Sequence, residues 1–215
     1  MPGDYGRFLS IKLTFRCNLP PGGLAFRSTA DPVELPDSTC EREPRMTPSD
    51  SQSGTIVRRA TPADLQSIGQ LGALLVKEHY DFDPQRFLAA RAVTPKGYAS
   101  FISTQLDDPD KAVLVADDHG DVIGYTYAAV EGYDYMALRG PAGVLHDIIV
   151  DPGHRSRGVG RLLLDAALEF FRSRAVPRVV LATAERNEAA QRLFARMGFR
   201  RTMIEMTCEL DDPAS

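Results

Sequence analysis

The residues between Ile148 and Arg161 join a strand-like run to a glycine-rich turn, and this arrangement can bind an anion. The run Ile148-Ile-Val150 is typical of a buried strand, and Gly158 and Gly160 follow where a helix is expected to begin. Glycine lets the backbone approach a ligand closely, and the first turn of a helix offers free N–H groups and the positive end of its dipole. The segment therefore predicts a site for a phosphate-bearing cofactor.

Three glycine-loop chemistries compete for this turn. A nucleoside-triphosphate loop requires Lys and then Ser or Thr after its last glycine, and this chain has Arg161-Leu162 there. A dinucleotide loop of a nicotinamide oxidoreductase requires a third glycine, where this chain has Leu163, although Glu185 could mimic its ribose-binding acid. The third is an Arg-x-x-Gly-x-Gly pattern, which residues 155–160 match.

The chain contains four segments, Ile148-Ile-Val-Asp-Pro152, Arg155-Ser-Arg-Gly-Val-Gly160, Ala182-Thr-Ala-Glu-Arg-Asn187 and Ala190-Gln-Arg-Leu-Phe-Ala-Arg-Met-Gly-Phe199. Together they resemble the GNAT superfamily of acyl-CoA-dependent N-acyltransferases. The likeness runs from about residue 55 to 210 and implies a mixed α/β sheet, the GNAT-like acyl-CoA N-acyltransferase fold, with acetyl-CoA as co-substrate. In that family the turn's amides hold the coenzyme A pyrophosphate, and the preceding strand and a later asparagine contact the pantetheine arm. The resemblance assigns cofactor contacts to Ile148, Ile149, Val150, Arg155, Ser156, Arg157, Gly158, Val159, Gly160, Arg161 and Asn187.

Some of these residues also have ordinary structural explanations. Asn187 is suited to cap the final helix, a role that is compatible with a cofactor contact. Arg155 and Arg157 could be solvated surface charges, but two arginines inside one cradle favour contact with an anion.

His146, on the strand that leads into the cradle, is the first candidate for a general base. Amines have pKa values of about 10, so acetyl transfer to an amine needs a group that titrates near neutrality to take a proton. Alternation predicts that His146 shares a face with Ile148 and Val150, while Asp147 points the other way. This strand resembles that of diamine and arylalkylamine N-acetyltransferases, in which an acid or a histidine at the His146 position serves the amine. A histidine at the edge of the core is the structural alternative, and Glu131 or a water chain anchored by Asp147 is the catalytic one.

Phe194 and Ala182 differ from the residues that similar enzymes have at these positions. Many place a tyrosine in the last helix as general acid for the thiolate, and this chain has Phe194 there; ribosomal-protein N-terminal acetyltransferases carry a glutamate where it has Ala182. Water or another hydroxyl must then protonate the thiolate, or the thiolate leaves unaided, as a thiol pKa of about 8.5 permits.

The functional hypothesis from the sequence is an N-acetyltransferase that acts on a primary amine of a small molecule or peptide by direct attack, without a covalent intermediate. A non-catalytic acyl-CoA-binding module is the alternative.

Two segments could frame the acceptor pocket, and their acidity favours a cationic amine. The residues of these two segments also have a structural explanation that needs no substrate, because one segment is a helix end and the other a tyrosine-bearing loop. They are Glu78, His79, Tyr80, Glu131, Tyr133 and Tyr135.

The surrounding pattern predicts the elements that hold these residues. Thr61-Pro-Ala-Asp64 is typical of a helix start, residues 84–107 predict one or two short helices interrupted by Pro95-Lys-Gly97, and residues 131–143 predict a loop. Helices are expected at about 65–80, after Gly160, and at 190–197, where Gly198 ends the last one. Strands are expected at 55–59, 111–116, 122–130, 144–150, 178–183 and, from alternation that predicts one buried face, at 202–210.

Composition limits the remaining possibilities. The chain has 215 residues, a net charge of -4 and three scattered cysteines, Cys17, Cys40 and Cys208. These values disfavour nucleic-acid binding, a disulfide framework and a metal site, and favour a cytoplasmic monomer or homodimer that does not enter membranes. Residues 1–53 are rich in Pro, Gly and Ser and predict a disordered leader, for which Met46 is an alternative start; residues 54–215 are expected to form the N-acetyltransferase domain.

Overall fold

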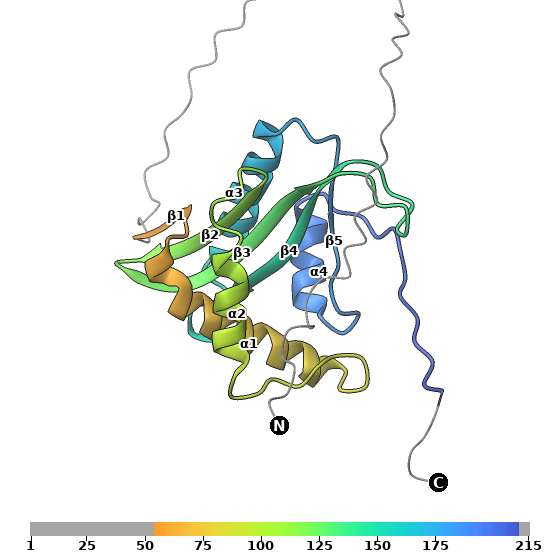
Figure 1. Cartoon of the computed structure of the whole chain (residues 1–215), viewed down its shortest axis with the longest axis horizontal. Helices are drawn as coiled ribbons and strands as arrows, with labels where there is room; N and C mark the ends of the chain where they lie inside the picture. Colours follow the sequence, from red (N-terminus) through yellow and green to blue (C-terminus); the bar gives the residue numbers. More distant parts are fainter. Residues whose placement is uncertain (1–53, 211–215) are drawn as a thin grey trace, which may run out of the picture. The chain divides into compact units, whose positions relative to one another are not determined.

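A five-stranded sheet organises the part of the chain that the structure, a computed structural model, describes, residues 54–210 (Figure 1). The strand order is β1-β2-β3-β4-β5; the first four strands are antiparallel and β5 runs parallel to β4. The strands are β1 (Thr55–Arg59), β2 (Lys111–Asp118), β3 (Asp121–Glu131), β4 (Ala142–Val150) and β5 (Val179–Leu181). The helices are α1 (Leu65–Phe82), α2 (Thr94–Ser103), α3 (Val159–Ser173) and α4 (Glu188–Arg196), with short 3-10 turns at Pro62–Asp64 and Pro152–His154.

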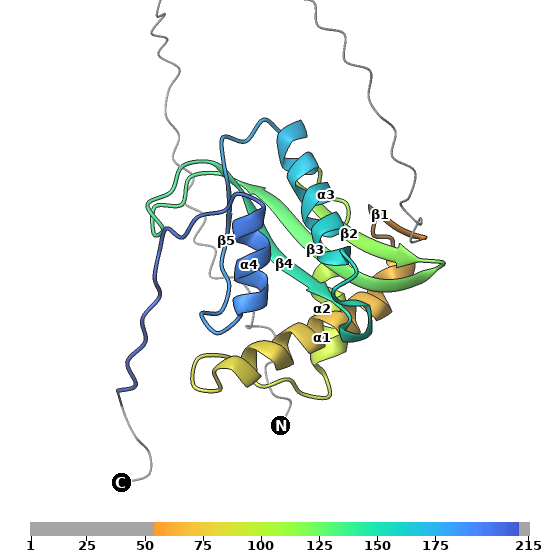
Figure 2. The ribbon, with the colours of Figure 1, turned by 180° about the vertical axis from the view of Figure 1, so that it is seen from behind.

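Helices cover both faces of this sheet (Figures 1 and 2). On one face, Ile68 of α1 and Ile102 of α2 pack on Tyr125 of β3. On the other face, Leu164 of α3 and Phe194 of α4 share a cluster with residues of β2, β3 and β4. Because both faces are covered, β2 and β3 carry nearly continuous runs of buried residues rather than strict alternation.

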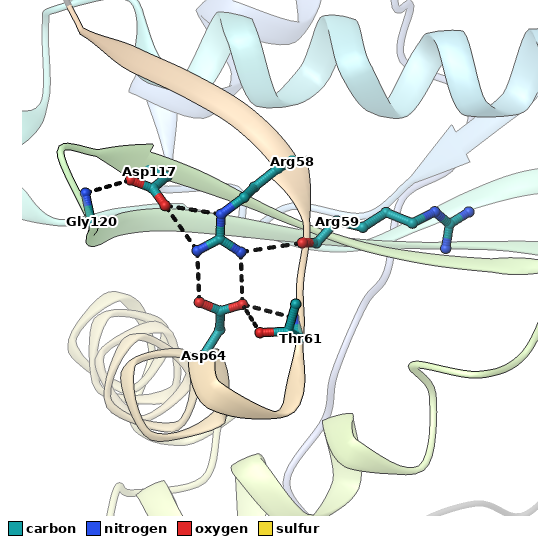
Figure 3. A network of polar contacts seen from close by, with 6 residues as sticks. All are labelled: Arg58, Arg59, Thr61, Asp64, Asp117 and Gly120. Carbon is teal, nitrogen blue, oxygen red and sulfur yellow. Dashed lines mark hydrogen bonds and ion pairs between the residues drawn. The ribbon is translucent and has the colours of Figure 1, made fainter.

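A partly buried ion pair fixes β1 to the start of α1 (Figure 3). Arg58 donates two hydrogen bonds to the carboxylate of Asp64, at 2.8 and 2.9 Å, and a third to Asp117 at 2.9 Å. Asp64 also accepts hydrogen bonds from the backbone N–H and hydroxyl of Thr61. The bond from Arg58 lowers the pKa of Asp64 to about 2 although burial opposes it. Figure 3 shows Arg58 between the two carboxylates, with Asp117 also held by Gly120.

The predicted end of the last helix is confirmed. Gly198 has φ +88°, a left-handed conformation that glycine adopts without strain. Its N–H donates to Ala195 O, and the N–H of Phe199 donates to Phe194 O, which is the pattern of a Schellman motif. The rings of Phe194 and Phe199 lie 5.9 Å apart and supply the accompanying apolar contact.

Two predictions about elements are wrong. Residues 202–210 form no strand and are exposed, because alternation predicts a buried face without providing a neighbouring strand for the backbone. In that segment the Glu205 carboxylate pairs with Arg86, with Arg86 Nη2 at 3.1 Å. Pro95 does not interrupt a helix either; it lies in the first turn of α2, where the missing N–H costs no hydrogen bond.

The leader predicted at residues 1–53 and the alternative start at Met46 lie outside the described residues. Residues 54–210 fall within one compact unit of the chain. Among the helices of this described part, none is both long and apolar enough to cross a membrane.

Candidate active site

Strand β5 is short and pairs only with the beginning of β4, and a cleft opens beyond the paired residues. Gly143, Val144 and Leu145 pair with residues 179–181, and β4 then continues to Val150 without β5 beside it. The cleft has a volume of about 1020 Å³. Residues 145–150 line one wall and residues 181–183 the opposite wall. The β5-facing edge of β4 can therefore pair with an extended ligand there.

The glycine-rich turn closes one end of this cleft. Ser156 and Gly158 have φ values of +63° and +85°, and α3 begins directly after Gly158. The N–H groups of residues 156–160 have no acceptor within the described part of the chain. A Cβ on Gly160 would lie 3.5 Å from Leu193 and 3.8 Å from Val150, so this position faces the gap between α4 and β4. A cradle of free N–H groups at a helix N-terminus fits a diphosphate.

The arginines of the turn point in different directions. Arg155 lines the cleft, where Nε donates to Val150 O at 2.9 Å and Nη2 lies 2.5 Å from Glu78 of α1. Arg161 also lines the cleft and pairs with Asp165 at 3.5 Å. Arg157 instead lines a smaller hollow of about 230 Å³ that also contains two histidines, His119 and His154. The structure thus brings together all the predicted cofactor residues except Arg157.

A β-bulge changes the predicted orientation of His146. Asp147 pairs with Tyr127 and Leu145 pairs with Ala128, so His146 is an extra residue in β4. Its ring stacks on Tyr127 at 4.9 Å, on the α1–α2 face of the sheet, whereas Ile148 packs on the α3 face. The prediction that His146 shares a face with Ile148 and Val150 is therefore wrong. The bulge places His146 and Asp147 on the same face.

His146 belongs to a chain of polar contacts that leads out of the cleft. Its Nε2 lies 3.1 Å from Glu131 Oε1, and Arg139 donates to Glu131 Oε2 at 2.9 Å. With Nε2–H directed at the carboxylate, Nδ1 is the unprotonated nitrogen of the neutral ring. Burial raises the pKa of Tyr127, on which this ring stacks, to about 12.

Asp147 is held by two tyrosine hydroxyls from different elements. Tyr98 of α2 and Tyr125 of β3 both donate to Asp147 Oδ2, the latter at 3.1 Å. Burial raises the pKa of the Asp147 carboxyl, and the two hydrogen bonds counteract that shift. Asp147 and His79 both line the cleft, and His79 Nδ1 lies 2.8 Å from Leu75 O. This face of the cleft can therefore accept a cation or a proton.

The sequence pattern indicated neither Tyr98 nor Tyr125 as a residue of the site. Tyr125 and Tyr127 occupy alternate positions of β3, and that spacing could have placed both hydroxyls beside β4. Tyr98 lies in the segment 84–107, which lacks a clear periodic signal.

Asn187 and Phe194 line the opposite side of the cleft. Asn187 Oδ1 accepts a hydrogen bond from Ala190 N at 3.1 Å, so the asparagine caps α4 as expected and its amide NH₂ can still serve a ligand. Phe194 is buried in the α3–α4 cluster and offers no hydroxyl to the cleft.

Comparison with known proteins identifies the family. Residues 74–199, more than half of the chain, match the model of the acetyltransferase (GNAT) family. The chain belongs to this family. The mixed α/β sheet and the GNAT membership that the motifs predicted are thus confirmed.

Two of the proteins that this chain is similar to are named as acetyltransferases. The chain is 35% identical over 97 residues to a mycothiol acetyltransferase of Thermobispora bispora, which covers 43% of this chain and 31% of that protein. It is 24% identical over 145 residues to the uncharacterized N-acetyltransferase YhfO of Bacillus subtilis, which covers 66% of this chain and 88% of that one. The chain therefore spans about a third of the mycothiol acetyltransferase and most of YhfO.

Two solved structures share the fold of this chain. A mutant of the BH1408 protein of Bacillus halodurans has a TM-score of 0.64 at 21% identity, covering 72% of this chain and 99% of that one. AAC(6′)-Iy, in complex with the bisubstrate analogue CoA-S-monomethyl-acetylneamine, has a TM-score of 0.55 at 18% identity, covering 74% and 99%. At these identities the likeness shows the fold alone.

Proposed function

We propose that this protein is an acetyl-CoA-dependent N-acetyltransferase that acts on a primary amine of a small molecule or peptide. The observation that supports it most is one continuous cleft that joins an N–H cradle, the free edge of β4 and two titratable side chains. The cradle at residues 156–160 suits the diphosphate of the co-substrate. The β4 edge at Ile148–Val150 and the amide of Asn187 suit its pantetheine arm. When bound, acetyl-CoA supplies the acyl group as a thioester.

Direct transfer requires a neutral amine close to the thioester carbonyl. The new N–C bond forms as the C–S bond breaks, and the amine must lose a proton. In this proposal Asp147 attracts the acceptor's ammonium group, because its carboxylate lies in the cleft between two tyrosine donors. His146 then accepts the proton at Nδ1, while Glu131 holds the ring through Nε2.

Protonation of the departing thiolate is assigned to no side chain. Phe194 supplies no acid, and a thiol pKa of about 8.5 lets the thiolate leave and take a proton from water. The same phenylalanine is the observation that favours the second candidate, an acyl-CoA-binding module without catalysis.

A combined binding and turnover experiment tests the proposal. Calorimetry with acetyl-CoA is expected to show binding, and an amine panel of amino acids, polyamines, aminoglycosides and peptides is expected to include at least one amine that releases free thiol. Mass spectrometry of the product should show one added acetyl group. Binding without thiol release for any amine would support the binding module, and absence of acetyl-CoA binding would contradict both.

A further inference from the structure

The cleft is lined by more arginine side chains than a diphosphate cradle needs. Five arginines line it: Arg155, Arg161, Arg192 and Arg196, the last two from α4, and Arg86, which pairs with Glu205. Arg155 is committed to Glu78 and to the Val150 carbonyl. Three guanidinium groups therefore remain beside the cradle, at the α3–α4 wall.

These three side chains are poorly neutralised. Arg161 and Arg192 pair with Asp165 and Glu188, but both arginine side chains are more than 60% exposed, and neither carboxylate residue lines the cleft. Exposed pairs one helical turn apart are weak, so they leave a guanidinium free to bind another anion. Within residues 54–210, Arg196 forms no ion pair.

Their positions on the helices bring them toward one place. Arg192 and Arg196 are four residues apart, so they share one face of α4. Between them in sequence lies Leu193, whose side chain is the nearest neighbour of a Cβ at Gly160 in the cradle. Arg161 lies in the first turn of α3, where the helix dipole disfavours a cation and a nearby anion would offset that cost. Figure 2 shows α3 and α4 on the same side of the sheet.

We propose that Arg161, Arg192 and Arg196 form a second anion site, which binds the 3′-phosphate of coenzyme A. This inference rests on the proposed function. With the pantetheine arm along β4 and the diphosphate in the cradle, the phosphorylated ribose is the next group and must lie beyond the cradle. Guanidinium groups are suited to a terminal phosphate because they donate several charge-assisted hydrogen bonds. The protein should therefore discriminate acetyl-CoA from acetyl-dephospho-CoA, which lacks only this phosphate.

Calorimetry with the full chain and these two ligands tests the site. The wild type is expected to bind acetyl-dephospho-CoA about 10- to 100-fold more weakly than acetyl-CoA. The double substitution Arg192→Ala and Arg196→Ala should weaken acetyl-CoA binding by a similar factor and leave acetyl-dephospho-CoA binding nearly unchanged. The ratio of the two affinities should then approach one.

Arg172→Ala is the matched control, because Arg172 lies on α3, pairs with Glu169 and does not line the cleft. It should keep the wild-type ratio. If the wild type binds acetyl-CoA and acetyl-dephospho-CoA equally well, the inference is overturned and the proposed function stays intact. If the wild type binds neither ligand, the proposed function itself is contradicted. An unchanged ratio in the double variant, with a raised KM only for amines that carry an anionic group, would assign the arginines to the acceptor instead and overturn the inference.

Discussion

His146 and Asp147 are neighbours in sequence, yet both side chains enter the same side of the sheet. The extra residue in β4 makes this possible, because it breaks the alternation that would otherwise separate them. Their environments differ: His146 is bound to Glu131 at the rim, and Asp147 is held between Tyr98 and Tyr125. Under the proposed function, this difference makes His146 the proton acceptor and Asp147 the carboxylate that attracts a cation.

Replacing His146 tests its role as proton acceptor separately from the role of Asp147. We expect His146→Ala to lower kcat by about 100-fold or more, which is typical of a lost general base, with little change in acetyl-CoA affinity. Steady-state thiol release with the best amine, together with calorimetry, measures both quantities. His146→Gln keeps a polar side chain of similar reach without basicity, so it should be as slow as the alanine variant. Near-full activity of either variant at pH 7 would assign the role of general base to Glu131 or to a water chain anchored by Asp147 instead.

The glycine-rich turn before α3 is the feature of the site that its sequence predicts best. Gly158 follows the strand and precedes the helix, and the structure has the left-handed φ there that opens the cradle. Because a turn of this kind is local, residue types alone were sufficient to predict it. Asn187 was predicted as a helix cap for the same reason, and it is one.

Pairing between distant segments was harder to predict than local turns. The bulge at His146 depends on the register between β3 and β4, which no local pattern encodes. The predicted strand at 202–210 failed similarly, since Ile204 and Met206 alternate with polar residues yet remain exposed. Tyr98 reaches Asp147 across 49 positions in sequence, so only the packing of α2 reveals it.

The cradle gives an element-scale prediction. Gly160→Glu should abolish acetyl-CoA binding while the protein still folds, because the side chain would place bulk and negative charge in the gap between α4 and β4. Gly160→Ala is the matched control, since its Cβ would make only ordinary contacts at 3.5 and 3.8 Å and should retain binding. Calorimetry and circular dichroism measure binding and folding. Unchanged affinity in a folded Glu variant would refute the cradle.

Across the described part of the chain, charge separates along the cleft. Arginines gather beside the cradle, and the carboxylate of Asp147 lies farther back along β4, on the face covered by α1 and α2. An anionic co-substrate and a cationic acceptor would therefore bind at different ends of one cleft. This arrangement requires α1 to stay fixed relative to the sheet, since residues of α1 line the cleft.

The ion pairs of Arg58 fix the start of α1 to the sheet, and their removal should cost stability at neutral pH. The Asp64 side chain is only 7% exposed, and Arg58 keeps its pKa at about 2, below the usual 3.8. A lowered pKa stabilises the folded state above the unfolded value, and this contribution disappears as pH falls toward 2. We expect Arg58→Met to lower the free energy of unfolding by about 2 kcal/mol at pH 7 and the melting temperature by about 4–8 °C.

The pH dependence distinguishes this ion pair from simple packing. The difference in the free energy of unfolding between wild type and Arg58→Met should become smaller from pH 5 to pH 2, because protonated Asp64 no longer requires a cation. Urea unfolding at several pH values measures it. Arg172→Met breaks an exposed pair with Glu169 and should change stability by less than about 1 kcal/mol at every pH. A difference for Arg58→Met that stays constant with pH would mean that its packing, rather than its charge, fixes β1 to α1.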